Sequence, residues 1–247
     1  MKHADYAKNF RKAFDDLSYR RSWHDAFRDF IEIAACTIHQ EPYFYGHLDK
    51  DDDYDRIEQR YLDTIKKYTR EEIDLIVTLY STSLMALRTS EQDFLGQQYM
   101  DLEVSNKHNG EFFTPNEISR MIAKMQMHGI GSKISAQGYI TLQEPACGAG
   151  VMIIEAANAI REEGHDPCIS LLFQAIDINR TCFNMAYFQL SALCLPGVVI
   201  HGDTLRMEQW ESRATPQWKM MQKHGVSAHL LPNAIQPITP AQATLNL

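Results

Sequence analysis

The chain has 247 residues, a formal net charge of −8, 45% hydrophobic residues and 23% charged residues. These proportions are ordinary for a globular protein with one large domain or two modest ones, and no apolar run approaches the roughly 18 residues that a membrane helix requires. The acidic balance argues mildly against independent DNA binding, because a protein that clamps DNA alone usually presents a basic footprint.

Residues 1–105 are predicted to form a helical domain. In "SWHDAFRDFIEIAAC", Ser22 is the expected N-cap, and apolar residues recur at helical spacing from Trp23 onward. In "TREEIDLIVTLYSTSLMAL", Thr69 and Glu72 form an expected capping box ahead of a second apolar stripe. Aromatic-rich stripes of this kind are typical of the core of a helix bundle.

The acidic stretch "DKDDDYDRIE", residues 49–58, invites a calcium interpretation through Asp51, Asp53 and Asp55. An EF-hand loop would then need glycine at its sixth position and glutamate at its twelfth, where this chain has Arg56 and Leu62. The stretch is better explained as a solvated helix start, since acidic side chains stabilise the positive end of a helix. The histidines near the C-terminus lack ligand spacing, and we predict no metal site.

The pattern of apolar residues changes after about residue 105, and residues 106–210 are predicted to form an α/β domain. The segment "GEFFTPNEISRMI", residues 110–122, predicts a helix with Thr114 as N-cap, Pro115 in the first turn and Glu117 closing a capping box. Its buried face is expected to carry four apolar side chains, Ile118, Met121, Ile122 and Met125.

The next segments alternate between strand and helix. "YITLQEPACGAG" predicts a strand and a turn, "VMIIEAANAIREEG" a helix ended by Gly164, and "SLLFQAID" a second strand. "NRTCFNMAYFQLSALCL" predicts another helix and "VVIHGD" a third strand. This order is that of one half of a doubly wound sheet with parallel strands. Residues 211–247 are predicted to be an irregular tail, with room for one more strand at "VSAHLL".

Three acidic residues, Glu144, Asp177 and Asp203, follow the three predicted strands. Ligands of such sheets bind beyond the carboxyl ends of the strands, so we expect the three acids in register on one rim, where they can accept hydrogen bonds from hydroxyl and amino groups. Gly148 and Gly150 in the first turn would let a ligand approach the backbone, although an ordinary strand-to-helix corner also carries such glycines.

Three segments carry a family resemblance. "EPACGAG" resembles the S-adenosylmethionine motif of the N-6 adenine DNA methyltransferases, particularly the modification subunits of type I restriction systems. "GEFFTPNEISRMI" is similar to the G-x-F/Y-x-T-P segment of that family, and "DFLGQQYMDLEV", residues 93–104, to the stretch before it. Short plasmid- or phage-borne members share this layout. The resemblance implies the Rossmann-like fold of S-adenosylmethionine-dependent methyltransferases and methyl transfer to adenine N6 in DNA.

The resemblance also implies S-adenosylmethionine as the cofactor and a role for eight residues. Cys147 matches the family pattern but is not used there as a nucleophile. The implied cofactor-binding residues are Phe113, Thr114 and Pro115 near the methionine end, Glu144, Ala146 and Gly148 in the turn, Asp177 at the ribose hydroxyls, and Asp203 at the adenine amino group.

One family element does not occur in the chain. No N/D-P-P-Y/F sequence follows Asp203, so the catalytic residues are unknown. Only three or four strands can be placed, so the sheet is expected to be truncated, with an open edge beside its first strand that calls for a partner subunit or a homo-oligomer. The alternative function is a catalytically silent protein that keeps the cofactor pocket and binds a restriction or modification complex.

The cysteine pattern bears on the compartment. The five cysteines are odd in number, widely spaced and without a C-x-x-C pair. The stretch "MKHADYAKNFRKAF" lacks the apolar core of a signal peptide. We therefore expect reduced thiols in a cytoplasmic protein that is not associated with a membrane.

Overall fold

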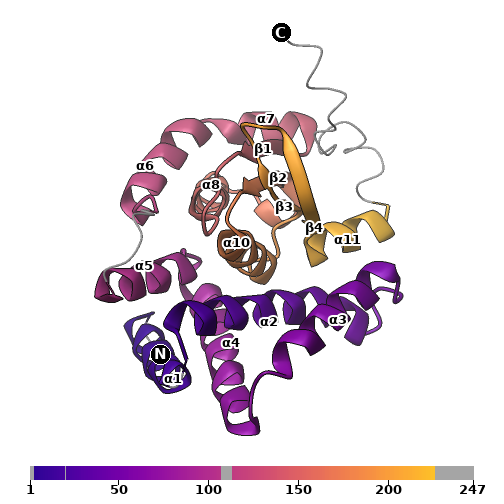
Figure 1. Ribbon diagram of the computed structural model, residues 1–247. Helices are drawn as coiled ribbons and strands as arrows, with labels where there is room; N and C mark the ends of the chain where they lie inside the picture. Colours follow the sequence, from indigo (N-terminus) through magenta and orange to yellow (C-terminus); the bar gives the residue numbers. More distant parts are fainter. Residues whose placement is uncertain (1–2, 20, 107–112, 226–247) are drawn as a thin grey trace.

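A computed structural model describes residues 3–19, 21–106 and 113–225 of the chain. It contains a group of N-terminal helices and a sheet with helices around it (Figure 1), and α10 (Arg180–Ala192) packs between the strands and α2 (Trp23–Phe44). One continuous hydrophobic core runs through both parts. The strand predicted at "VSAHLL" lies outside the described residues.

The N-terminal part is helical, as the apolar periodicity predicts. The capping box of Thr69 and Glu72 is present, and Asp51 is the N-cap of the third helix, where its side chain accepts a hydrogen bond from the Tyr54 N–H. None of the described helices is both long enough and apolar enough to cross a membrane. The helices besides α2 are α1 (His3–Ser18), α3 (Asp52–Ile65), α4 (Arg70–Ser90) and α5 (Leu95–Asn106).

Among the described residues, the second part holds a mixed sheet of four strands in the order β1-β2-β3-β4. The first three strands are parallel, which confirms the predicted strand–helix–strand–helix–strand unit, and β4 is antiparallel to β3. The strands are β1 (Ile140–Glu144), β2 (Leu171–Asp177), β3 (Gly197–Asp203) and β4 (Glu208–Ala214). The remaining helices are α6 (Asn116–Met127), α7 (Ile130–Gln137), α8 (Val151–Glu162), α9 (Pro167–Ser170) and α11 (Pro216–Lys223).

The acids that end the three parallel strands are staggered, and the expectation of three acids in register is wrong. Glu144 pairs in register with Ala175, two residues before Asp177. Asp177 pairs with His201, which in turn lies two residues before Asp203. Since two residues is the period of a strand, the three acids still belong to one face of the sheet.

The start and the buried face of α6 also differ from the prediction. Pro115 is the N-cap and no side-chain cap hydrogen bond is present, so Thr114 and Glu117 do not form a capping box. The helix buries its small residues Ser119 and Ala123 together with Met127. Small side chains allow α6 to approach α8 closely, and this packing decides which face is covered.

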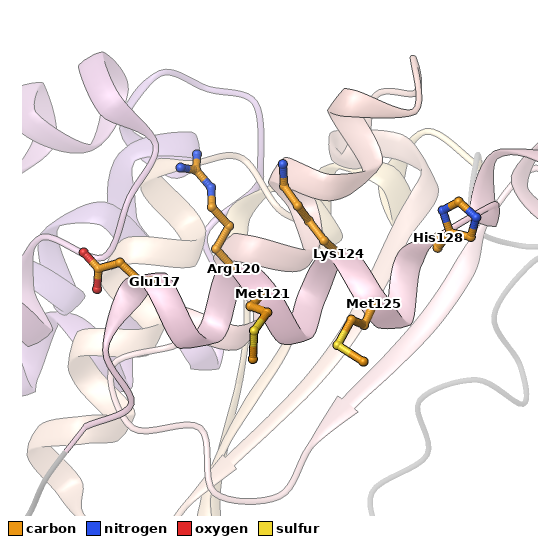
Figure 2. Close-up of a pocket in the computed structure, with 6 residues that line it drawn as sticks. All are labelled: Glu117, Arg120, Met121, Lys124, Met125 and His128. Atoms are coloured by element: carbon orange, nitrogen blue, oxygen red, sulfur yellow. The ribbon is translucent and has the colours of Figure 1, made fainter.

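Three of the four residues of the predicted apolar stripe of α6 face outward, and the fourth, Ile122, is half-buried. Ile118, Met121 and Met125 are 44%, 54% and 74% exposed. Met121 and Met125 line a shallow groove along the helix, and Figure 2 shows them pointing to one side of α6 while Arg120 and Lys124 point to the other.

The described part of the predicted irregular tail is largely regular, which the sequence does not predict. β4 crosses the expected boundary at residue 210, and α11 follows with Thr215 as its N-cap, accepting a hydrogen bond from the Trp218 N–H. Trp218 and Met221 are buried against Leu172 on the sheet. This apolar contact, added to strand pairing with β3, explains why the segment is regular. The division of the chain into three domains is not tested and stays a prediction.

Candidate functional site

The turn between β1 and α8 depends on its two glycines. Gly148 and Gly150 have φ values of +53° and +95°, in the left-handed region that side chains disfavour. A Cβ atom on Gly148 would stand 3.1 Å from the Cδ1 atom of Phe113. The aromatic ring therefore covers the turn closely, and any larger residue at position 148 would displace it.

Asp177 connects the end of β2 to this turn. Its Oδ2 atom accepts a hydrogen bond from the Gly148 N–H at 2.8 Å, and its Oδ1 atom accepts one from the Asn179 N–H at 2.8 Å. The residue is only 9% exposed. The side chain therefore fixes both the turn after β1 and the start of the loop after β2.

The other two rim acids hold their own loops. Glu144 accepts a hydrogen bond from the Ala146 N–H at 3.3 Å, and Asp203 accepts bonds from the Leu205 and Arg206 N–H groups at 2.9 and 3.1 Å. Burial, and in smaller part the charge of Asp177, raises the pKa of Glu144. A second carboxylate close by makes the rim electronegative, which suits a ligand that brings hydroxyls, an amino group or a positive charge.

Thr204 is a site residue that sequence reasoning missed. Its hydroxyl donates a hydrogen bond of 2.6 Å to the carbonyl of Pro145. The loop after β3 is thereby fastened to the turn after β1, across the end of β2. A threonine directly after a strand-ending acid is too common a pattern to have indicated this bond.

The predicted methionine-end residues lie partly over the turn. Phe113 is half-buried, between Gly148 and the ring of Tyr99, whose centroid is 5.8 Å away. Thr114 and Pro115 are exposed. The segment before α6 and the glycine turn are 30 or more residues apart in sequence, and the structure brings Phe113 and Gly148 together as expected.

A buried amide supports the turn from below and was also missed. Gln189 of α10 donates to the Ala149 carbonyl and to Asp93, each at 2.8 Å. Its Oε1 atom accepts hydrogen bonds from the N–H groups of Phe94 and Leu95, each at 2.9 Å. Gln189 is fully buried, and burial raises the pKa of Asp93. These bonds tie the glycine turn to the start of α5.

The residues present fit S-adenosylmethionine. α8 begins at Gly150 without a side-chain cap, so its N-terminal N–H groups adjoin the turn, where they favour an anionic group such as a carboxylate. The rim acids suit ribose hydroxyls, an adenine amino group and a cationic sulfonium. Cys147 is buried, and burial raises the pKa of its thiol, which disfavours the thiolate that a nucleophilic cysteine needs.

A family model and several known proteins are similar to this chain. The family model "N-6 DNA Methylase" matches residues 91–226. The chain is 23% identical over 156 residues to the "Type I restriction enzyme MpnII methylase subunit" of Mycoplasma pneumoniae. That match covers 60% of this chain and 27% of the relative, so the chain spans about a quarter of the relative's length.

Two solved structures are loosely similar. One is a putative class I S-adenosylmethionine-dependent methyltransferase from Listeria monocytogenes, with 15% identity, a TM-score of 0.42, and 81% of this chain and 54% of that chain covered. The other is the methyltransferase subunit of a type I restriction-modification system from Streptococcus thermophilus, with 12% identity, a TM-score of 0.47, and 83% and 59% covered. Scores at this level carry no argument about function.

Proposed function

The chain belongs to the N-6 DNA methylase family, and from this premise we propose that it binds S-adenosylmethionine at the glycine turn and takes part in methyl transfer to adenine N6 in DNA. The observation that carries the proposal is the bond between Asp177 and the Gly148 N–H, because it joins the two parts of the rim that would hold one ligand.

Each rim residue has a proposed role. Phe113, with Thr114 and Pro115, adjoins the methionine end, while Glu144, Ala146 and Gly148 form the wall beneath it. Asp177 accepts hydrogen bonds from the ribose hydroxyls, and Asp203 accepts one from the adenine amino group. When bound, S-adenosylmethionine supplies an electrophilic methyl group on its sulfonium, and the acids of this chain orient it.

The target amino group needs more than proximity to a methyl donor. The lone pair of adenine N6 is delocalised into the ring, so hydrogen-bond acceptors and a stacking ring are required to orient it. The chain holds no N/D-P-P-Y/F sequence that would supply them. We propose that a partner subunit or a second copy supplies these groups and the recognition of DNA.

The open edge of the sheet is where such a partner would add. Within the described residues β1 pairs only with β2, and Thr141 and Gln143 of β1 are exposed. An unpaired strand edge presents N–H and C=O groups to another chain. The catalytically silent binding protein remains the second candidate, because the same edge and the same missing sequence would serve a protein that only joins a complex.

Two experiments separate these functions. Calorimetric titration with S-adenosylmethionine tests the pocket, and no heat of binding under native conditions would contradict the cofactor. Incubation with tritiated S-adenosylmethionine and unmethylated DNA, with and without host extract, tests the transfer step. Label in DNA only with extract supports the partner version, whereas cofactor binding without label in either case supports the silent protein.

A further inference from the structure

A second cavity lies on the helical part of the molecule, between α2 and α3. Its volume of about 320 Å³ is at the lower end of the range that small-molecule sites occupy. Tyr99 of α5 packs near the start of α2 at Trp23, and Figure 1 shows the α2–α3 junction at the opposite end of α2. The cavity is therefore separate from the glycine turn.

Four aromatic rings line the cavity. Tyr54 and Tyr61 come from one face of α3, with Glu58 between them at helical spacing. Phe44 and Tyr45 stand at the rim and are 82% and 68% exposed. Rings held at the edge of a cavity provide faces on which a flat or cationic group can stack.

The charges around the cavity favour a cation. Glu41 and Glu58 both line it, and Glu58 is half-buried with no ion pair among the described residues. Glu41 accepts a hydrogen bond of 2.7 Å from the Tyr80 hydroxyl, which fixes the carboxylate. The C-terminal end of α2 lies at Phe44, and the negative end of a helix dipole attracts positive charge.

The protein already places one of its own cations here. The Lys50 Nζ atom lies 4.4 Å from the centroid of the Tyr54 ring. Lys50 is exposed and belongs to the α2–α3 connection, so it can move aside. On the cavity floor, the buried Nε2 atom of Gln40 has no hydrogen-bond partner among the described residues.

We propose that this cavity binds an organic cation, with a guanidinium preferred, and that Lys50 competes with it. A guanidinium is planar, stacks on tyrosine faces and donates in a fork to carboxylates such as Glu58. The Gln40 Nε2 group is a donor, so it pairs with an acceptor elsewhere on the ligand, such as a backbone carbonyl of an arginine, and not with the guanidinium. The thiol of Cys36, on the same wall, takes no part in the chemistry, because burial raises its pKa to about 12.

Titration of the ¹⁵N-labelled full chain with N-acetyl-L-arginine methylamide tests the proposal, with N-acetyl-L-citrulline methylamide as its neutral isostere. We expect a saturable shift of the Gln40 side-chain amide resonances and an affinity for the citrulline compound about tenfold weaker. No saturable shift, or equal affinity for both compounds, would overturn the proposal.

Three variants sharpen the test. Glu58→Gln should weaken binding about three- to tenfold, and Lys50→Met should strengthen it because it removes the internal competitor. Asp63→Asn, on the same helix but outside the cavity, should leave the affinity unchanged. Neither Glu58 nor Lys50 forms an ion pair among the described residues, so the thermal midpoint should stay within a few degrees of wild type. Weaker binding by Lys50→Met would contradict the competition.

The source of the cation is a separate arm of the experiment. A capped peptide with one central arginine between glycines is compared with the free arginine amide. Tighter binding of the peptide identifies a polypeptide side chain as the occupant, whereas equal affinity identifies a free small cation. The result does not depend on S-adenosylmethionine, because the cavity and the glycine turn are separate.

Discussion

The Asp177 carboxylate accepts a hydrogen bond from the Gly148 N–H at 2.8 Å, so the end of β2 holds the turn that follows β1. The bond joins a buried residue, Asp177, to a partly buried one, Gly148, and the sequence predicts both for one site. Any ligand that touches the turn therefore depends on a side chain from the neighbouring strand.

Replacement of Asp177 by alanine should abolish binding of S-adenosylmethionine. The substitution leaves the N–H groups of Gly148 and Asn179 without their acceptor, at a cost of about 1–3 kcal/mol each if they stay buried. Calorimetry measures the affinity and urea unfolding the stability. Asp74→Ala, at an exposed acid of α4, is the matched control and should change neither. Wild-type affinity in Asp177→Ala would mean that the site is misplaced.

Gly148→Ala should destabilise the fold by about 1–2 kcal/mol, because position 148 has a left-handed φ of +53°. The new methyl group also meets the Phe113 ring at about 3.1 Å. The double variant with Phe113→Ala relieves the contact but not the backbone strain, so it should restore only part of the difference between Gly148→Ala and wild type. Gly148→Asp should abolish cofactor binding while circular dichroism still shows folded N-terminal helices.

Gln189→Leu should be among the most destabilising single changes, at about 3 kcal/mol. It leaves the N–H groups of Phe94 and Leu95 and the Ala149 carbonyl without their partner in a buried place. Urea unfolding followed by fluorescence measures the loss. Gln217→Leu, whose amide donates to the Cys168 carbonyl in a partly buried position, is the control and should cost much less.

Stability should fall as the pH is lowered from about 6.5 to about 4, through the protonation of His39. Burial lowers the pKa of His39 to about 4, against an ordinary value near 6.5. In this window the unfolded chain binds a proton that the folded chain excludes, so the stabilisation is present above the unfolded pKa and is lost as the pH falls. The loss can reach roughly 3 kcal/mol.

The surroundings of His39 explain why its neutral form is favoured. The Tyr187 hydroxyl donates to the Ala214 carbonyl, so its oxygen accepts from the His39 Nδ1 atom at 2.7 Å. The other ring nitrogen is 3.4 Å from the Lys219 ammonium and 3.3 Å from the Asp53 carboxylate. Urea midpoints measured at pH 7 and pH 5 should differ in wild type and differ less in His39→Gln. An equal pH dependence in both proteins would assign the titration to another group.

The exposed stripe of α6 should tolerate charge, whereas its small face should not tolerate size. Met121→Glu and Met125→Glu should each change stability by no more than about 0.5 kcal/mol. Ala123 is 1% exposed and lies on the face of α6 that packs on α8. Ala123→Leu should therefore lower the free energy of unfolding by about 1–3 kcal/mol. Thermal unfolding compares the three variants. A large loss of stability in Met121→Glu or Met125→Glu would mean that the methionine face of α6 is buried, as the apolar periodicity predicts.

The elements with one strong local signal were predictable from the sequence. One such element is the capping box at Thr69, and another is the parallel strand–helix unit around Gly148 and Asp177. Their sequence patterns are compatible with few other local structures. The buried face of α6 could not be predicted, because Ser119 and Ala123 give no hydrophobic signal and are selected only by close packing on α8. The same holds for Gln189, whose four partners come from two distant turns.

The secondary structure of the C-terminal part, β4 and α11, could not be predicted for a different reason. The alternation of charged and apolar residues in β4 is weak, and its strand character arises from pairing with β3. The helix α11 is stabilised because its residues Trp218 and Met221 pack against Leu172 of the sheet. Both are long-range effects that propensity does not record.

The ends of the parallel strands at the rim are staggered by two residues from β1 to β2 and by two more from β2 to β3. The hydrogen bond from the Thr204 hydroxyl to the Pro145 carbonyl nevertheless brings the loops after β3 and β1 together across the end of β2. The turn after β1 is therefore held from both other parallel strands, by Asp177 at the end of β2 and by Thr204 after β3.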